Sequence, residues 1–515
     1  RLAAAAGAPT TPGWSGEDQS DERLATEAAA IGWPILIKPV AGGGGKGMRK
    51  VERAGDFAEA LAGARREAVA AFGDGTVLLE RFVSRPRHIE IQVFADRHGG
   101  LVHLFERDCS LQRRHQKVIE EAPAPGMSEE VRAALTSAAL KAAAAVGYEG
   151  AGTVEFIADA SKGLSAEKVW FMEMNTRLQV EHPVTEAITG QDLVEWQIRI
   201  AAGEPLPLAQ EEIRARGWAI EARLYAEDPA RGFLPSVGRL ARWRIPEGTR
   251  LDSGYEEGSA ISPFYDPMIA KLIAHKSERS EAAAELARVC RGIEAWPVRT
   301  NAAFLANCLS DTAFVAGEVD TAFIEDRLPA IASAPEPEAA AILAALANET
   351  RGAAPWKGQA EAQGWRLNAS PALERTIFIE GEPFEAALAS GGAGKGELVA
   401  IAGEKVWFEH GAGFRVSLFA PSDPLIQAIS SDGVIRAPMP GRIVQTPVSA
   451  GEAVEPGRTL IVLEAMKMEH ALSAPAAGKV AEVLCTEGDQ VIEGQPLARI
   501  EIVRPRPKTE SKASR

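Results

Sequence analysis

Hydrophobic and polar side chains alternate along several short segments of the chain, and this period of two predicts β-strands. The clearest segments are 34–38, 77–82, 88–95, 153–157 and 171–175. In segment 88–95, His88, Glu90 and Gln92 share one predicted face, which we expect to be wet or to face a ligand. Segment 129–146 carries its apolar residues at helical spacing instead, so it predicts a structural helix.

The C-terminal part of the chain contains an internal repeat without gaps. The motif Ala-Pro-x-x-Gly at 437–441 recurs 37 positions later at 474–478, and five further residues recur at the same spacing. Such a repeat of short segments between glycines predicts two copies of one small β-unit, packed face to face. The sequence EAMKMEH, 464–470, lies at the junction and places Lys467 at a hairpin tip. A lysine there is either a solubilising charge or an attachment site.

The two acidic segments 153–157 and 171–175 predict a cation site. If they are neighbouring antiparallel strands, Glu155, Glu173 and Asn175 lie close together on one face. Two like charges a few Å apart repel by roughly 4 kcal/mol at an effective dielectric constant near 20, so they favour a cation. Hard oxygen ligands favour magnesium over zinc. The alternative is a pair of edge strands with solvated charges.

The period of two continues beyond the second acidic segment in Arg177, Gln179 and Glu181. We therefore expect these side chains to extend the same face as a reaction centre. The dense polar segment 106–117 either belongs to this centre or forms an exposed loop.

A glycine-rich loop, 42–47, follows the predicted strand 34–38. Glycines allow main-chain N–H groups to approach an anion, and Lys38 in the strand favours a nucleotide phosphate. The loop lacks the Gly-Lys-Ser/Thr of a Walker A motif. A flexible linker is the alternative.

Composition and charge exclude several classes of protein. A chain of 515 residues is too long for one core and suggests three or four domains. The net charge of −15 argues against a general nucleic-acid or anionic-membrane binder. The sequence shows neither a membrane-spanning apolar run nor a signal-peptide pattern. The 4 cysteines are scattered, which predicts no disulfide framework and no zinc site. We expect a bacterial cytoplasmic protein without nucleic-acid or membrane partners.

Two parts of the chain resemble known families. EAMKMEH resembles the biotinyl carrier domain of biotin-dependent carboxylases, whose attachment lysine lies between two methionines. The related lipoyl domain lacks those methionines. Residues 1 to about 330 resemble biotin carboxylase through the motifs RDCSLQRRHQK, 107–117, and EMNTRLQVEHPVTE, 173–186.

The resemblance implies roles for individual residues. Lys467 carries biotin through an amide. The ATP phosphates are held by Lys38, Gly43, Gly44 and Gly45. The base and ribose are surrounded by Glu80, His88, Gln112 and His115. Magnesium or manganese is held by Glu155 and Glu173, with Asn175 nearby. The bicarbonate pocket is shaped by Lys117, Arg177, Gln179 and Val180. Glu181 is the base that deprotonates bicarbonate, and Arg223 stabilises the biotin enolate.

The expected fold is multidomain α+β. Its parts are an ATP-grasp domain (1–205), a biotin carboxylase C-terminal domain (206–330), a helix-plus-β-barrel docking domain (331–420), a linker (421–433), an all-β biotinyl, lipoyl-like hammerhead domain (434–503) and a disordered tail (504–515). The family usually begins with a further nucleotide-fold domain and another phosphate-binding lysine. Neither precedes Arg1, so we expect this chain by itself to bind ATP weakly.

The resemblance implies an ATP-dependent ligase, the α-subunit of an acyl-CoA carboxylase, with biotin, ATP, magnesium and bicarbonate as cofactors and substrates. The domain order and EAMKMEH are most similar to 3-methylcrotonyl-CoA carboxylases of leucine degradation, with geranyl-CoA and propionyl-CoA carboxylases as alternatives. The implied partners are a carboxyltransferase β-subunit, which holds the acyl-CoA, and a biotin protein ligase. Two other classes remain open: a non-catalytic carrier and docking subunit, and a different ATP-grasp ligase fused to a lipoyl-type carrier.

Overall fold

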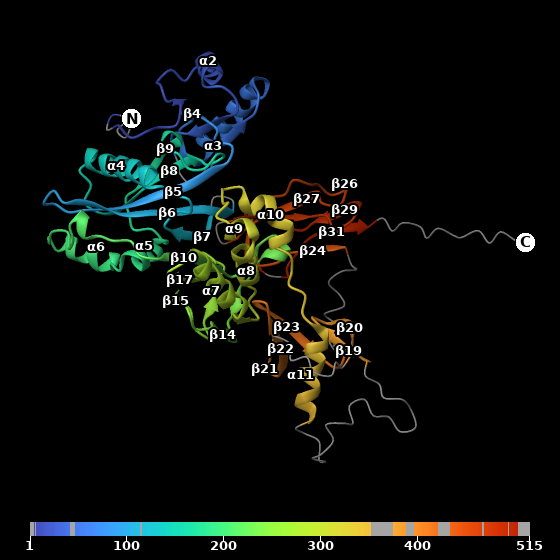
Figure 1. Cartoon of the computed structure of the whole chain (residues 1–515). Coiled ribbons are helices and arrows are strands. Elements are labelled where there is room, and N and C mark those ends of the chain that lie inside the picture. The colour runs from blue at the N-terminus through green and yellow to red at the C-terminus, as the bar shows by residue number, and fades with distance from the viewer. Residues whose placement is uncertain are drawn as a thin grey trace, which may run out of the picture.

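A computed structural model describes residues 5, 7–41, 47–113, 116–351, 374–387, 396–420, 433–465, 468–492 and 494–502. A small N-terminal sheet, a large central sheet, a five-stranded unit and a C-terminal sandwich follow one another along the chain (Figure 1). Among the described helices, none has the length and apolar character needed to cross a bilayer.

The N-terminal sheet is antiparallel and four-stranded. Its strands, in spatial order, are β1 (Gly13–Trp14), β4 (Val77–Arg81), β2 (Ile35–Pro39) and β3 (Arg49–Val51). Helices α2 (Asp21–Ile31) and α3 (Phe57–Phe72) pack against it through Leu24 and Leu61. The predicted strands 34–38 and 77–82 are thus confirmed. The predicted phosphate loop with Gly43, Gly44 and Gly45 lies outside the described residues.

The central sheet has eight strands, and each neighbouring pair is antiparallel. In spatial order they are β15 (Arg250–Ser253), β17 (Met268–Lys276), β10 (Trp218–Tyr225), β7 (Gln116–Ala122), β6 (Leu101–Arg113), β5 (Pro86–Ala95), β8 (Gly150–Asp159) and β9 (Val169–Asn175). Because β10 pairs with β7, this sheet runs across the boundary predicted between residues 205 and 206. One apolar core correspondingly joins Leu111 and Ile119 to Ile220 and Leu272.

The structure decides between the alternatives left open for two of these segments. The strand predicted at 88–95 is present, and Glu90 and Gln92 are 0 % exposed, so its polar face is not solvent-exposed. Arg107 covers that face and supplies the hydrogen bonds that water would otherwise provide. Residues 106–113 and 116–117 belong to strands β6 and β7, not to an exposed loop.

Helices flank the central sheet. They are α4 (Glu129–Ala145), α5 (His182–Thr189), α6 (Leu193–Ala201), α7 (Arg279–Arg291), α8 (Ala302–Ser310), α9 (Thr312–Val315) and α10 (Phe323–Ile331). The predicted helix 129–146 is confirmed as α4. Its N-terminus is capped by Ser128, whose Oγ accepts a hydrogen bond from Val131 N at 3.3 Å.

Short elements complete the N-terminal and central regions. The 3₁₀ helices are η1 (Ala54–Asp56), η2 (Ala166–Lys168), η3 (Gln210–Glu212) and η4 (Pro229–Arg231). The two-stranded ladders are β11 (Glu227–Asp228) with β12 (Leu234–Pro235), β13 (Gly238–Arg239) with β16 (Ala260–Ile261), and β14 (Arg242–Arg244) with β18 (Glu294–Trp296).

The five-stranded unit follows helix α11 (Ala339–Arg351), which confirms the expected order of a helix and then short strands. Its strands, in spatial order, are β20 (Glu382–Ala387), β19 (Glu374–Ile379), β23 (Ala412–Ser417), β22 (Glu404–Glu409) and β21 (Glu397–Ile401). The unit is attached to the preceding region through Trp296, which packs with Val406 and Phe408. Arg299 adds a hydrogen bond to Gly413 O at 2.6 Å.

The C-terminal sandwich, residues 433–502, consists of two four-stranded sheets. One contains β24 (Val434–Arg436), β31 (Pro496–Ile502), β29 (Gly478–Val483) and β26 (Ala453–Val454). The other contains β28 (Met468–Ser473), β27 (Thr459–Ala465), β25 (Gly441–Gln445) and β30 (Gln490–Val491). Both ends of β27 and of β31 differ by the repeat length of 37 residues, and the spatial order of strands in one sheet maps onto the other. The predicted repeat of one β-unit is therefore confirmed, but each sheet takes two strands from each copy, so the two copies interleave and do not pack as separate face-to-face units.

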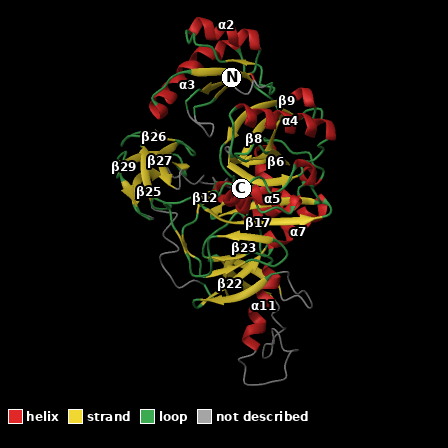
Figure 2. Cartoon of the chain, turned by 90° about the vertical axis from the view of Figure 1, so that its left-hand side faces the viewer, coloured by secondary structure: helices red, strands yellow, loops and turns green. Residues whose placement is uncertain are grey.

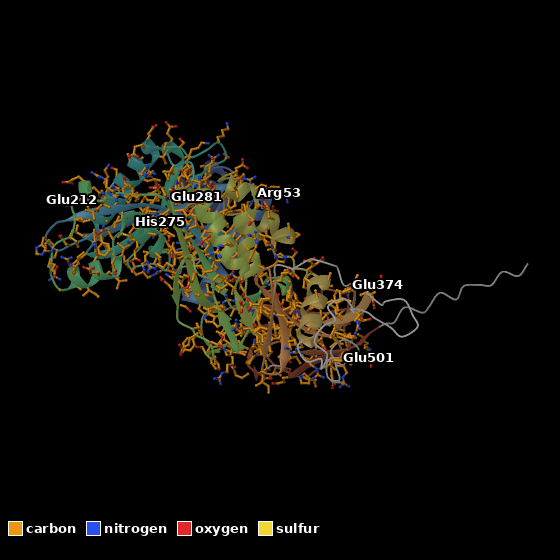
Figure 3. The ribbon with its side chains drawn as sticks, turned by 60° about the horizontal axis from the view of Figure 1, so that its bottom comes forward. Arg53, Glu212, His275, Glu281, Glu374 and Glu501 are labelled. Carbon is orange, nitrogen blue, oxygen red and sulfur yellow. The ribbon has the colours of Figure 1, made fainter. Side chains whose placement is uncertain are left out.

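The sandwich contacts the central region through Leu234 of β12, which packs against the sandwich core. Figure 2 shows β12 beside its strands. In Figure 3, Glu374 of β19 and Glu501 of β31 lie on the side of the molecule away from Glu212. The β27–β28 ladder ends where Ala465 pairs with Met468, and Lys467 lies outside the described residues, as do the expected linker (421–432) and tail (503–515).

Candidate active site

Lys117 is the centre of a cluster of carboxylates on the central sheet. Its Nζ lies 2.7 Å from Glu90 Oε2 on β5 and 3.3 Å from Glu155 Oε1 on β8, and it also donates to Glu181 Oε1. Burial alone would lower the pKa of Lys117, but the surrounding negative charges raise it well above its ordinary value. The lysine is therefore a fixed positive charge at the point where two strands and the N-terminus of α5 meet.

A fully buried arginine, Arg107 of β6, donates hydrogen bonds to residues of this cluster. It donates to Glu90 and, at 2.8 Å, to Gln92 Oε1, which are both on β5. It also donates at 3.2 Å to Thr153 on β8 and to Gln179 ahead of α5. Burial raises the pKa of Glu90, but the charges of Arg107 and Lys117 outweigh burial and bring it down to about 2. Glu90 is consequently ionised and holds both cations in place.

Glu181 lies between two cations. It is the N-cap residue of α5, and it is 2 % exposed. Arg223 of β10 donates from Nη2 to Glu181 Oε2 at 2.9 Å, while Lys117 contacts the other oxygen. Arg223 Nε also donates to Glu120 Oε1 on β7 at 2.6 Å. A carboxylate between two cations can receive an anionic substrate, because its own charge is balanced.

The segment between β9 and α5 differs from the expected continuation of the strand. Strand β9 ends at Asn175, and residues 176–181 are irregular with a turn at 180–181, so the period of two there does not reflect a strand. Gln179 nevertheless reaches the cluster, with Nε2 2.8 Å from Glu155 Oε1. Arg177 is exposed and contacts the Leu178 carbonyl oxygen at 3.4 Å, so the structure does not bring its side chain into the cluster. Val180 contributes its carbonyl oxygen, which accepts a hydrogen bond from Lys271 Nζ at 2.7 Å.

The candidate metal ligands lie on neighbouring strands, as expected. Glu155 is directly opposite Glu173, and Thr153 is opposite Asn175. Glu173 is exposed, whereas Glu155 is buried and has His88 Nε2 at 3.1 Å from its Oε2. Burial raises the pKa of Glu155, but His88 and Lys117 lower it well below its usual range. Two carboxylates and an amide oxygen on one sheet edge fit a hard cation such as magnesium.

The candidate nucleotide residues are divided between the two sheets. Lys38 of β2 and Glu80 of β4 form an ion pair on the small sheet, with Nζ and Oε2 3.1 Å apart. His88 and Gln112 lie on the central sheet, where Gln112 pairs with Lys117. His115 falls outside the described residues.

Sequence reasoning assigned no role to Glu90, Arg107, Glu120 or Lys271. Glu90 carried a usable signal, because it alternates with His88 and Gln92 in an otherwise apolar strand. The partners of the other three residues come from distant strands, which one sequence does not reveal.

Comparisons with known proteins agree with this geometry. The family model of the carbamoyl-phosphate synthase L chain ATP-binding domain matches residues 1–209, that of the biotin carboxylase C-terminal domain matches 221–326, and that of biotin-requiring enzymes matches 433–500. The mitochondrial methylcrotonoyl-CoA carboxylase subunit alpha of Arabidopsis thaliana is 41% identical over 550 residues, covering 91% of this chain and 74% of the relative. The propionyl-CoA carboxylase alpha chain of Ruegeria pomeroyi is 36% identical over 544 residues, covering 91% of this chain and 78% of the relative.

Among solved structures, the chain is similar to the biotin carboxylase domain of Hydrogenobacter thermophilus 2-oxoglutarate carboxylase, determined with MgADP, ADP and bicarbonate. The TM-score is 0.61 at 43% identity, over 65% of this chain and 73% of that one. With a carboxylase region and a biotinyl region matched in one polypeptide, the chain belongs to the family of biotin-dependent acyl-CoA carboxylase alpha subunits.

Proposed function

We propose that this subunit carboxylates biotin on its own Lys467 and delivers it to a carboxyltransferase β-subunit that carboxylates 3-methylcrotonyl-CoA. The reaction class, an ATP-dependent ligase that uses biotin, magnesium and bicarbonate, follows from the family. The observation that best supports the residue assignments is the position of Glu181 between Lys117 and Arg223.

In this proposal, Lys117 attracts bicarbonate to the cluster and Glu181 removes its proton. Glu181 contacts Lys117 and Arg223, and a carboxylate within hydrogen-bonding reach of bicarbonate can act as a general base. Gln179 holds the neighbouring Glu155 at 2.8 Å and so preserves the shape of the pocket. The exposed side chain of Arg177 is free to turn toward the developing phosphate anion.

Arg223 supplies positive charge where the ureido oxygen of biotin becomes negative. Glu120 and Glu181 hold its guanidinium at 2.6 and 2.9 Å, so its orientation does not depend on substrate. Lys38 and Glu80 contribute to the nucleotide site from the small sheet. Glu155 and Glu173, with Asn175, would hold magnesium, which neutralises phosphate charge when bound.

The choice of acyl-CoA is supported by the relatives. The methylcrotonoyl-CoA carboxylase subunit shares 41% identity with this chain and the propionyl-CoA carboxylase chain shares 36%, each over 91% of it. The five-stranded unit is the proposed docking site for the β-subunit, a biotin protein ligase would attach biotin, and we place the complex in a bacterial cytoplasm.

The test is to co-purify the full-length subunit with its β-subunit and measure fixation of labelled bicarbonate on 3-methylcrotonyl-, geranyl-, propionyl- and acetyl-CoA. We expect strong fixation on 3-methylcrotonyl-CoA. Preference for another acyl-CoA would contradict the acceptor. Biotinylation of Lys467 without bicarbonate-dependent ATP hydrolysis would instead indicate a non-catalytic carrier.

A further inference from the structure

Glu120, which holds Arg223, lies beside a second buried glutamate, Glu221, that has no role in the reaction described above. Glu120 of β7 and Glu221 of β10 are directly opposite each other in the antiparallel ladder, so their side chains leave the same face of the sheet. Both residues are 0 % exposed. Two ionised carboxylates in this position would repel each other without solvent screening.

The hydrogen bonds to this pair are incomplete. Arg223 Nε donates to Glu120 Oε1 at 2.6 Å. Glu120 Oε2 and both carboxyl oxygens of Glu221 are buried and accept no hydrogen bond from the described residues. Buried oxygens without a donor are costly, and one proton between the two carboxyl groups would provide the missing donor.

The nearest additional cation, Lys271 of β17, does not fill this gap. Its Nζ lies 3.9 Å from Glu221 Oε2, beyond hydrogen-bonding distance. The same Nζ donates to Val180 O at 2.7 Å and lies 3.4 Å from Asp252 Oδ2. Lys271 therefore binds the turn before α5 and strand β15, and it supplies no hydrogen bond to Glu221.

The wider surroundings of Glu221 also favour a neutral carboxyl group. The charged and titratable groups around the pair are Lys117 of β7, Arg223 and Tyr225 of β10, Asp252 of β15, Lys271 of β17 and Glu181 ahead of α5. Burial, and after it the charge of Glu120, raises the pKa of Glu221 well above its usual value.

We propose that Glu221 stays protonated at neutral pH and donates its O–H to Glu120, so that the pair carries a single negative charge. This hydrogen bond fixes the Glu120 carboxylate, which in turn fixes the guanidinium of Arg223. Glu221 is thus a positioning residue that acts through Glu120. If both glutamates were ionised, their combined charge would compete with the substrate for Arg223. The consequence for catalysis rests on the proposed role of Arg223, whereas the shared proton does not.

Infrared spectroscopy of the biotinylated full-length protein tests the proton directly. We expect a protonated-carboxyl stretching band at pH 8 that shifts in D₂O and is lost in Glu221→Gln. The matched control is Glu227→Gln, which removes another buried glutamate that contacts Arg113. The control should leave the band unchanged. A wild-type spectrum without this band at pH 8, or a band that survives Glu221→Gln, would overturn the proposal.

Kinetics test the positioning role. Glutamine retains an N–H donor, so Glu221→Gln should keep most of the biotin carboxylation rate. Glu221→Leu has no donor and should lower kcat roughly tenfold through a misoriented Arg223, with an unchanged KM for ATP. Equal losses in both variants, or no loss in either, would refute this role. If the wild-type protein shows no bicarbonate-dependent ATP hydrolysis, the proposed function is refuted instead. The infrared band would still show whether Glu120 and Glu221 share a proton.

Discussion

Replacing Arg107 with methionine should destabilise the central sheet more than any single surface change. The arginine is fully buried and hydrogen-bonds to strands β5 and β8 and to Gln179. Methionine has a similar length but no donors. Arg107→Met therefore leaves Glu90 as a buried carboxylate that has lost one of its two cations.

The scale of the effect follows from the pKa of Glu90, which, against the effect of burial, Arg107 and Lys117 together lower from 4.5 to about 2. A shift of this size corresponds to about 3 kcal/mol of stability. Removing one partner of a buried ion pair costs about 3–5 kcal/mol, a similar range. For a unit of 150–250 residues, 3 kcal/mol corresponds to a decrease in Tm of roughly 6–12 °C.

The stability from this ionised carboxylate has a defined pH dependence. Because the folded-state pKa is lowered, the contribution is complete above pH 4.5 and is lost as the pH falls toward 2. The difference between wild type and Arg107→Met should therefore shrink by about 1.4 kcal/mol for each pH unit below 4.5.

Differential scanning calorimetry at pH 7 and at pH 3 would measure both quantities. The control is Arg97→Met, because Arg97 forms an exposed pair with Glu149 that contributes at most about 1 kcal/mol. The double variant Arg107→Met with Glu90→Gln should recover part of the loss, since it also removes the unpaired charge. Equal Tm values for Arg107→Met and Arg97→Met would refute the reasoning.

Three further predictions follow from the site. Glu181→Gln should lower biotin carboxylation by roughly 10²-fold or more while mass spectrometry still finds biotin on Lys467, and a normal rate would disprove its role as base. Lys467→Arg should abolish transfer to acyl-CoA but leave carboxylation of free biotin, and biotin found elsewhere on the variant would contradict the attachment site. Burial raises the pKa of Glu227 to about 7 despite Arg113, so the folded protein loses stability as the pH rises from 4.5 through 7. Glu227→Gln should remove up to about 3 kcal/mol of that loss. The free energy of unfolding in urea, measured at pH 5 and at pH 8, tests this, and an unchanged difference between the two pH values would contradict it.

The parts of the fold that were predictable from the sequence are those with local or repeated patterns. The repeat of 37 positions predicted the sandwich because each half needs the other to bury its apolar face. Alternation placed Glu155 and Glu173 on facing strands, which the register confirms. The same rule failed at 177–181, because the strand ends at Asn175: Gln179 and Glu181 reach the cluster, whereas Arg177 is exposed.

The buried charge network was not predictable. Alternation marked the polar face that carries Glu90, but its pairing with Arg107 depends on strands β5 and β6 being neighbours in register. Glu120 and Glu221 are separated by 101 positions and meet only because β10 joins the sheet at β7. The domain boundaries and the individual site roles remain predictions, which limited proteolysis and the variants above can test.

The most direct test of the account is a single-turnover experiment with the biotinylated full-length subunit, ATP and labelled bicarbonate. We expect label to appear on the peptide containing Lys467, to require ATP, and to be absent in Glu181→Gln. Label on Lys467 that is independent of Glu181, or ATP hydrolysis without any labelled peptide, would contradict it.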